Sequence, residues 1–466
     1  MKSLFRAFCS LKLAIFLILS LTGSLITATI MESAYDTPTA QFWVYHSRWF
    51  YGLLTLLGTN ILCVALSRLP WKPKHTPFLM AHAGILILLS GALITDLHGL
   101  DGSLRVGEGE STSEVEVNAP LMSFNEGDQV KTMPIRWVPP GVDFKTVNVK
   151  DYGLKVDQLL SHADPVISFV SSEESAFPAL KLQIIGGAMR ITQEYWLWSG
   201  DPTWKNIQAG PAHLLLNASG PLPQGGPVIE FQSQKNGDLS YTAHSSDGKI
   251  VRGILKNGQI QSSLLTPGWK GDVKIKVMEW IPAATSHVEY VAAKIQYGAQ
   301  APPSAIHVQS EGGDIWLGLG DRATLQFKGR TVGLGYFNKH VVMPFAIKLH
   351  RFNIEHYEGT RNPSEFSSRV SVLGATNTPE TTISMNEPLT HGGITFYQAS
   401  YEDAEPRPTI SIFSVNRDPG RPFKYFGSLL LVSGTILLFA MKYVSARAGK
   451  KAQASSPVRS RYEASL

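Results

Sequence analysis

Four runs of apolar residues divide the chain into membrane and polar parts. They lie at Leu13–Ile30, Trp49–Leu66, Pro77–Thr95 and Tyr425–Met441. Each is close to the roughly 20 residues that a helix needs to cross about 30 Å of hydrocarbon. A long polar segment separates the third run from the fourth. The pattern therefore predicts a polar domain that is tethered to a membrane by helices at both ends.

The polar segment alternates apolar and polar residues, which is the pattern of half-buried strands. Val273, Ile275 and Val277, for example, alternate with lysines and a methionine. Similar short strands are expected at Leu180–Ile184, Val228–Gln232, Leu239–Ala243, Ile315–Leu319, Thr324–Phe327 and Ala346–Phe352. Turn pairs such as Asn-Gly and Asp-Gly separate them, and no convincing helical periodicity occurs. We expect a mostly antiparallel β domain, in two sandwich-like lobes that meet near Pro221–Pro227.

These patterns predict a membrane protein with four transmembrane α-helices in a 3+1 arrangement and a large, mostly antiparallel β domain outside the cytoplasm. The expected boundaries are an N-terminal membrane domain over 1–97, with helices at about 13–30, 49–66 and 77–95, a β-rich domain over 98–420, a fourth helix over 421–443 and a basic cytoplasmic tail over 444–466.

Lysine and arginine indicate the orientation of these helices. Basic residues precede the first apolar run, fill the connection between the second and third, and follow the fourth, at Lys2, Arg6, Lys12, Arg68, Lys72, Lys74, Lys442, Arg447, Lys450, Lys451, Arg459 and Arg461. The positive-inside rule then predicts that both termini are cytoplasmic. These anchors account for the net charge of +5, so nucleic-acid binding gains no support. The first run could be a cleaved signal peptide, but a retained helix is favoured because no clean A-x-A site follows.

Cysteine usage excludes one class of function. Cys9 and Cys63 are the two cysteines of the chain, and both precede the polar domain. That domain can form no disulfide and cannot be a thiol oxidoreductase. The chain also contains no C-x-x-C-H, so it carries no covalently attached c-type haem of its own.

His82 is the sharpest candidate for chemistry, because an ionisable side chain inside an apolar run is costly and is a functional candidate by default. A neutral imidazole is a common ligand of haem iron, whereas the alternative is a structural hydrogen bond between helices. Gly84 and Gly91 belong to a stripe of mainly small residues on the same run. Such a stripe lets another helix, or a flat ligand such as haem, approach closely.

Other motifs are not informative. No G-x-S-x-G, Walker loop or pair of catalytic acids occurs, so no catalytic residue is proposed. The histidines of the polar domain show no H-x-x-x-H or H-E-x-x-H spacing. His350 and His356 could share one face of a strand, but ordinary surface histidines are the favoured interpretation.

Several stretches, taken in order, resemble the ResB/CcsB-type proteins of system II cytochrome c biogenesis. In the membrane part the resemblance lies in Tyr35-Asp36-Thr37, Ala40-Gln41, Val44-Tyr45-His46-Ser47-Arg48-Trp49-Phe50, Asn60, Arg68, Pro70-Trp71-Lys72, His75 and His82-Ala83-Gly84. Near the other end it lies in Pro344-Phe345, Phe352, Tyr357, Gly359, Pro363, Asn386-Glu387-Pro388-Leu389, Gly393, Phe396-Tyr397-Gln398-Ala399-Ser400-Tyr401, Val415, Asp418-Pro419-Gly420, Tyr425 and Gly427. These stretches cover about a third of the chain.

The resemblance implies a multi-pass subunit of the bacterial inner (cytoplasmic) membrane that helps to move haem across it and present it to apocytochrome c. Such proteins work with a ResC/CcsA-type partner that carries a Trp-rich haem-handling motif. This chain lacks that motif, so it resembles a non-autonomous subunit of a cytochrome c synthase complex. In the family a histidine of the third span ligates haem b in transit, and His82 is the matching position. No residue of the polar domain can be matched to a haem ligand.

The resemblance and the residues together suggest a hypothesis. A groove of small residues beside His82, including Gly84 and Gly91, holds haem in the bilayer, with His82 as the axial ligand of the iron, and the polar domain positions the apocytochrome. The alternative is a non-enzymatic, membrane-tethered β-domain scaffold or sensor of the cell envelope, in which His82 is structural.

Overall fold

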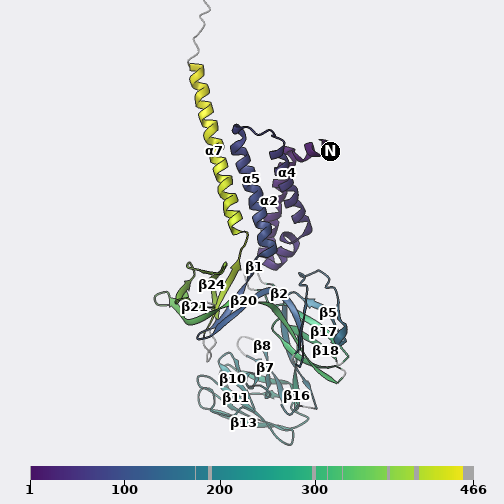
Figure 1. The fold of residues 1–466 in the computed structure, drawn as a ribbon. Coiled ribbons are helices and arrows are strands. Elements are labelled where there is room, and N and C mark those ends of the chain that lie inside the picture. The colour runs from purple at the N-terminus through teal and green to yellow at the C-terminus, as the bar shows by residue number, and fades with distance from the viewer. Residues whose placement is uncertain are drawn as a thin grey trace, which may run out of the picture. The chain divides into compact units, whose positions relative to one another are not determined.

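The computed structural model of the chain (Figure 1) describes residues 2–127, 129–173, 175–186, 192–295, 301–311, 313–327, 329–360, 362–374, 378–402 and 409–454. Contacts divide the chain into two compact units. The first unit comprises Met1–His162, Lys294–Gly313 and Leu317–Leu466, and the second comprises Ala163–Ala293 and Asp314–Trp316. The segment predicted as one β-rich domain, 98–420, therefore contributes to both.

The apolar runs are helical, as predicted. The helices of the first unit are α1 (Lys2–Phe8), α2 (Leu11–Ala34), α3 (Thr37–Ala40), the π-helix η1 (Gln41–Tyr45), α4 (Arg48–Leu66), the 3₁₀ turn η2 (Pro73–His75), α5 (Thr76–His98) and α7 (Arg421–Ala454). Four of the described helices are long and apolar enough to cross a membrane, at Leu11–Ala34, Arg48–Leu66, Pro73–His98 and Arg421–Arg447. The last one, α7, continues into the segment predicted as a tail, of which residues 455–466 lie outside the described part.

A ten-stranded sheet forms the main β structure of the first unit, in the order β22-β21-β20-β2-β1-β25-β24-β23, with β19 paired to β20 and β3 to β2. Its strands are β1 (Leu100–Gly107), β2 (Ser111–Glu126), β3 (Gln129–Pro134), β19 (Arg322–Phe327), β20 (Arg330–His356), β21 (Pro363–Leu373), β22 (Thr381–Ser384), β23 (Leu389–His391), β24 (Ile394–Glu402) and β25 (Ile410–Arg417). The first strand after α5, β1, pairs with the last strand before α7, β25. This pairing brings the ends of the two helices together.

A four-stranded sheet has the order β18-β17-β5-β4. It consists of β4 (Val147–Val149), β5 (Leu154–Leu160), β17 (Ala305–Ser310) and β18 (Gly313–Gly318), with the turn η3 (Lys150–Tyr152) between β4 and β5.

The second unit contains a β sandwich. One sheet has the order β14-β15-β7-β8 and the other the order β13-β12-β11-β10-β9, while β6 pairs with β16. The elements are β6 (Ala163–Ser171), β7 (Ala179–Ile185), β8 (Thr192–Trp198), α6 (Pro202–Lys205), β9 (Asn206–Ala209), β10 (Ala212–Leu216), β11 (Val228–Ser233), β12 (Leu239–His244), β13 (Ile250–Leu255), β14 (Leu264–Leu265), β15 (Lys274–Ile281) and β16 (Ala284–Ala292). Buried residues of both sheets, such as Leu182 and Phe231, form one core.

The predicted strands are confirmed, but the predicted boundary between lobes is wrong. The segment Pro221–Pro227 connects β10 to β11, which pair in parallel within one sheet. A connection between parallel neighbours needs extra length to return to the start of the sheet. The prolines and glycines of this segment therefore belong to a loop inside the second unit and do not separate two domains.

Helices α5 and α7 pack with their backbones in contact. Glycines recur every seventh residue along this contact, at Gly84 and Gly91 of α5, at Gly420 directly before α7, and at Gly427 and Gly434 of α7. A Cβ atom on Gly84 would lie 2.6 Å from the backbone nitrogen of Leu431 and 2.7 Å from the carbonyl oxygen of Gly427. A spacing of seven keeps such positions on one seam of a helix pair.

Asp418 joins this helix pair to the ten-stranded sheet. Its carboxylate accepts a hydrogen bond from the Thr95 hydroxyl at 2.6 Å and an ion-pair contact from Lys424 at 2.6 Å. Burial acts to raise the pKa of Asp418, but the hydrogen bonds from Lys424 and Thr95 outweigh it, so the pKa lies below its ordinary value. The end of β25 and the ends of both helices are thus held at one point.

A second polar contact joins the connection between α2 and α4 to the β part. The Nε2 atom of His162 lies 2.6 Å from a carboxylate oxygen of Asp36, and these side chains are 5% and 12% exposed. Asp36 also accepts the backbone N–H of Thr39 at 2.8 Å as the N-cap of α3. Burial acts to raise the pKa of Asp36, but the bonds from His162 and Thr39 prevail and hold it below its ordinary value.

The glycine seam generates the first prediction. Gly84→Ala should lower the thermal unfolding midpoint of the protein in detergent, because the new methyl group meets backbone atoms of α7 that cannot move aside, at a cost of about 1–3 kcal/mol. The matched control is Gly52→Ala in α4, where an added Cβ has nothing within 4 Å. Since alanine favours a helix by up to about 1 kcal/mol over glycine, the control should be neutral or stabilising. Equal midpoints for the two variants would contradict the packing.

The Asp36–His162 contact generates a prediction about pH. Because the folded-state pKa of Asp36 lies below the unfolded value of about 3.9, the contact stabilises the fold above that value and is lost as the pH falls through the folded-state pKa. Asp36→Asn keeps a capping side chain but removes the charge, and should cost about 1–2 kcal/mol at pH 6.

Unfolding midpoints of the wild type and this variant, measured from pH 6 to pH 3, should draw closer below the unfolded pKa of about 3.9. Asp143→Asn, at an exposed loop position, is the control and should parallel the wild type throughout. A constant difference between the wild type and Asp36→Asn over the whole range would mean that the charge of Asp36 has no stabilising role.

Candidate functional site: a groove between two apolar helices

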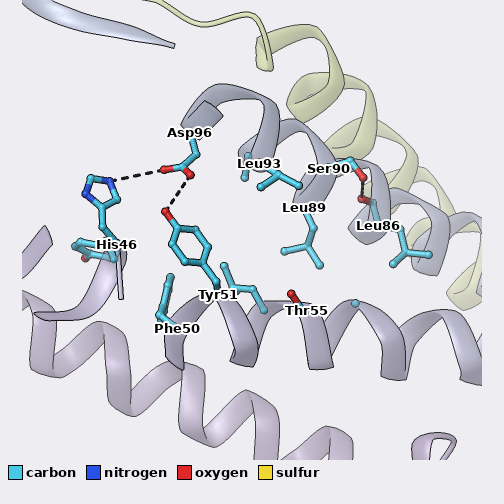
Figure 2. A pocket seen from close by; sticks show the side chains of 13 residues that line it. His46, Phe50, Tyr51, Thr55, Leu86, Leu89, Ser90, Leu93 and Asp96 are labelled. Atoms are coloured by element: carbon cyan, nitrogen blue, oxygen red, sulfur yellow. Dashed lines mark hydrogen bonds and ion pairs between the residues drawn. The ribbon is translucent and has the colours of Figure 1, made fainter. Parts of the chain in front are cut away.

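A cavity of about 420 Å³ lies between α4 and α5. Its lining residues are Tyr45, His46, Phe50, Tyr51, Leu54, Thr55, Gly58, Leu86, Leu89, Ser90, Ala92, Leu93 and Asp96. Figure 2 shows leucines along its length and three polar side chains, those of His46, Tyr51 and Asp96, gathered at one end. A concave site with mostly apolar walls and a few convergent polar groups is the usual form of a small-molecule site.

Three polar side chains meet at the end of the groove near the β structure. The Tyr51 hydroxyl donates a hydrogen bond of 2.9 Å to Asp96, and the Nε2 atom of His46 lies 3.6 Å from the other oxygen of the same carboxylate (Figure 2). The carboxylate is therefore held by α4 and faces the imidazole. Histidines that bind a metal usually donate the other ring N–H to a carboxylate, a backbone carbonyl or water.

An irregular turn places His46 at this position. The π-helix η1 ends at Tyr45, and His46 follows it with φ −99° and ψ 14°. Single turns of π-helix are rare and frequently occur at functional sites. Ser47 then caps α4 by accepting the backbone N–H of Phe50 at 3.3 Å, so the new helix begins directly after the histidine. A regular α-helix through these residues would direct His46 elsewhere.

His82 lies on the same face of α5 as the groove. Residues 82, 86, 89, 93 and 96 follow the i, i+4, i+7 pattern of one helical face, and the last four of these line the cavity. His82 is therefore one turn beyond the end formed by Leu86. With a rise of 1.5 Å per residue, it lies about 21 Å along α5 from Asp96.

The imidazole of His82 is oriented by its own helix. Its Nδ1 atom lies 2.9 Å from the carbonyl oxygen of Phe78, so this nitrogen carries the proton and donates it. The Nε2 atom then keeps its lone pair, which is the form that ligates a metal. The Phe78 ring packs against the imidazole, with ring centroids 3.8 Å apart, and the Arg68 guanidinium lies 3.7 Å from the centre of the Phe78 ring.

Gly84 and Gly91 lie on the other side of α5 from His82. Two residues along a helix turn the side chain by about 200°. Gly84 lies against the backbone of α7, and Gly91 lies against the Gly420 carbonyl and side-chain carbons of Phe423 and Lys424. The sequence left two uses open for these glycines, close approach of a second helix or close approach of a flat ligand. The structure has a second helix, α7, in close contact with them. The space next to these glycines is filled by α7, and the open groove lies on the opposite face.

His82 was predicted from the sequence, whereas His46, Tyr51 and Asp96 were not predicted as site residues. A signal for two of them was present, because His46 and Asp96 stand at the edges of the second and third apolar runs. No group of three or more histidine, cysteine, aspartate or glutamate residues that could hold a metal ion occurs among the described residues.

Comparison with known proteins finds two similarities. Residues 308–412 match the ResB-like family. The protein NrfI of Wolinella succinogenes is 35% identical over 117 residues, which are 25% of this chain and 13% of that relative. The family match falls in the strands from β17 to β25 and does not include the groove.

These findings confirm the resemblance that the sequence carries. They agree with the ordered matches at Pro344-Phe345, Asn386–Leu389 and Phe396–Tyr401, all within the matched residues. Residues 308–412 of the chain are thus similar to the ResB-like family, and the chain spans only a small part of the length of the relative that it matches.

Proposed function

We propose that this chain is a membrane subunit of a system II cytochrome c biogenesis complex that holds haem in the bilayer and presents it for covalent attachment to apocytochrome c. The ResB-like match and the relative support a role in cytochrome c biogenesis. The four apolar helices support a place in the membrane. Haem is the cargo in this proposal, bound without a covalent bond.

The proposed topology has both termini in the cytoplasm of a bacterial inner membrane and the β structure outside. The basic residues that flank the helices support this orientation. Exposed tryptophans support the position of α4 in the bilayer, since Trp49 at its start and Trp71 just after its end are each 51% exposed. Tryptophan prefers the interface between membrane and water. In this topology His46 and Asp96 lie at the outer surface and His82 lies nearer the inner one.

His82 is the proposed axial ligand, and the observation that carries this role is its orientation. The bond from Nδ1 to the Phe78 carbonyl leaves Nε2 free on the face of α5 that the groove occupies. Arg68, which stacks on Phe78, is placed to attract a haem propionate at the inner end, because a guanidinium binds carboxylates in a bidentate manner.

The geometry changes one part of the hypothesis drawn from the sequence. Since α7 covers Gly84 and Gly91, we place the macrocycle on the α4 side of α5, against the leucines of the groove. The groove is open on one side, so a second protein is needed to enclose a bound haem. A ResC/CcsA-type partner fits this need, and apocytochrome c is the acceptor.

The polar domain supports the same role. The exterior segment 98–420 contains no cysteine, so it cannot trap the reduced thiols of an apocytochrome as mixed disulfides. The alternative function, a tethered scaffold or sensor without haem, predicts that His82 has no effect on haem content.

The test is the haem content of the complex purified with its partner. His82→Ala should lower haem per complex at least ~10-fold, because the iron loses its proposed ligand. Added imidazole should restore part of it by replacing the missing ligand. His98→Ala is the matched control, since His98 ends the same helix, is exposed and projects about 160° away from His82.

Pyridine haemochrome assay and the Soret band measure the outcome. Unchanged haem content in His82→Ala would refute ligation by this residue and favour the scaffold.

A further inference from the structure

We propose that His46 forms a second haem-binding site at the outer end of the groove, to which haem passes from His82. This inference rests on the proposed function and adds to it a site at which cargo leaves the bilayer. Four features of the described residues support this inference. They are the His46 imidazole beside Asp96, the apolar walls of the groove, a cavity with three arginines on the other side of His46, and the distance between His46 and His82.

The first feature is the way in which His46 is held. Its imidazole is exposed to solvent and to the groove, and one ring nitrogen faces Asp96, whose carboxylate is in turn fixed by Tyr51. The other ring nitrogen remains for a ligand. A carboxylate that accepts the second ring N–H orients a ligating imidazole and raises its basicity, and Asp96 lies at an ion-pair distance of 3.6 Å from which it can take this role.

The second feature is the wall of the groove next to His46. Phe50, Leu54, Leu89 and Leu93 line the cavity there. In Figure 2, Leu89 and Leu93 lie to the right of Asp96. A flat apolar macrocycle can lie against such side chains, because burying its surface supplies most of the binding free energy.

The third feature is a polar cavity on the other side of His46. This cavity has a volume of about 1160 Å³, and His46 lines it together with the arginines at positions 48, 105 and 136. Its carboxylates are already engaged, because Asp36 contacts His162 and Glu116 accepts a hydrogen bond from Asn338.

Two of the arginines form no ion pair with the described residues and remain for an anionic ligand. Arg105 forms an ion pair with Glu402, whereas Arg48 follows His46 by two residues and Arg136 lies over the Phe42 ring at 5.8 Å. His46 therefore stands where apolar walls meet guanidinium groups. Haem has the matching chemistry, with an apolar ring, an iron that binds imidazole and two propionates.

Other occupants match less of the site. The acyl chain of a lipid has no group that binds the imidazole beside Asp96. A quinone could bind the imidazole but carries no anionic groups for the arginines. The combination of the three features thus selects haem.

The fourth feature is distance. Because about 21 Å of helix separates His82 from Asp96, one iron cannot bind both imidazoles. Passage from one to the other is a ligand exchange, in which the bond from His82 Nε2 to iron breaks and a bond from a His46 nitrogen forms. No electron or proton need leave the haem in this exchange.

The experiment is a titration of the full chain in nanodiscs with haemin, compared among four proteins. These are the wild type, His46→Ala, His82→Ala and the double variant. We expect His82→Ala to keep a haemin site with an imidazole-ligated spectrum, and the double variant to bind at least ~10-fold more weakly.

The comparisons separate the two proposals. If His82→Ala binds and absorbs like the double variant, His46 is not a ligand and this inference fails. If His46→Ala behaves like the double variant, His82 is not a ligand and the proposed function fails. His98→Ala is the control in both arms and should match the wild type.

Two further measurements test the parts of the site. In the His82→Ala background, Arg48→Ala combined with Arg136→Ala should weaken haemin several-fold but leave its dimethyl ester unaffected, because the ester lacks free carboxylates. Equal weakening of both ligands would refute propionate binding in the cavity. His46→Gln, which preserves size, should regain the spectrum with added imidazole; no recovery would also count against ligation.

Asp96 is a positioning residue in this proposal. In the same background, Asp96→Asn should raise the midpoint potential of the bound iron, because a less basic imidazole stabilises the ferric state less. A purely structural effect would change occupancy without moving the potential, and that result would remove Asp96 from the site.

Discussion

The contact between the backbones of α5 and α7 decides which face of α5 is left for a ligand. Glycines at intervals of seven let the helices approach so closely that any side chain on the seam would meet main-chain atoms. One face of α5 is thereby covered along its length, and the histidine face is turned toward α4. The polar contact among Asp418, Thr95 and Lys424 holds the same pair at its outer end. Since β25 leads directly into this contact, the sheet and the groove share one anchor.

Much of the fold could be predicted because its signals are local. Apolar runs of membrane length became α2, α4, α5 and α7, and alternating residues became strands such as β7, β11 and β12. The strand order could not be predicted, because it depends on contacts between distant segments. The pairing of β1 with β25, for example, closes more than three hundred residues of chain. The prolines of Pro221–Pro227 led to the wrong boundary between lobes, because a long loop within a sheet and a linker between domains have the same composition.

The same distinction explains what could be predicted of the site. An ionisable residue within an apolar run is visible in the sequence, so His82 could be named. The small-residue stripe was visible too, but its partner α7 lies far along the chain. His46, Tyr51 and Asp96 come from a π-helical turn and two helices, and nothing local indicates that they meet. The Asp36–His162 contact likewise joins residues that are 126 positions apart.

The arrangement of cations around the groove bears on how cargo could cross. Under the proposal, Arg68 meets the propionates at the inner end, and Arg48 and Arg136 meet them at the outer end. Between these ends α5 offers Leu86, Leu89 and Leu93, and ionised carboxylates are costly against such walls. The macrocycle can slide along leucines, but its propionates need a polar path. Under the proposal, a partner supplies that path at the open side of the groove, while this chain would provide two ligation points and an apolar track.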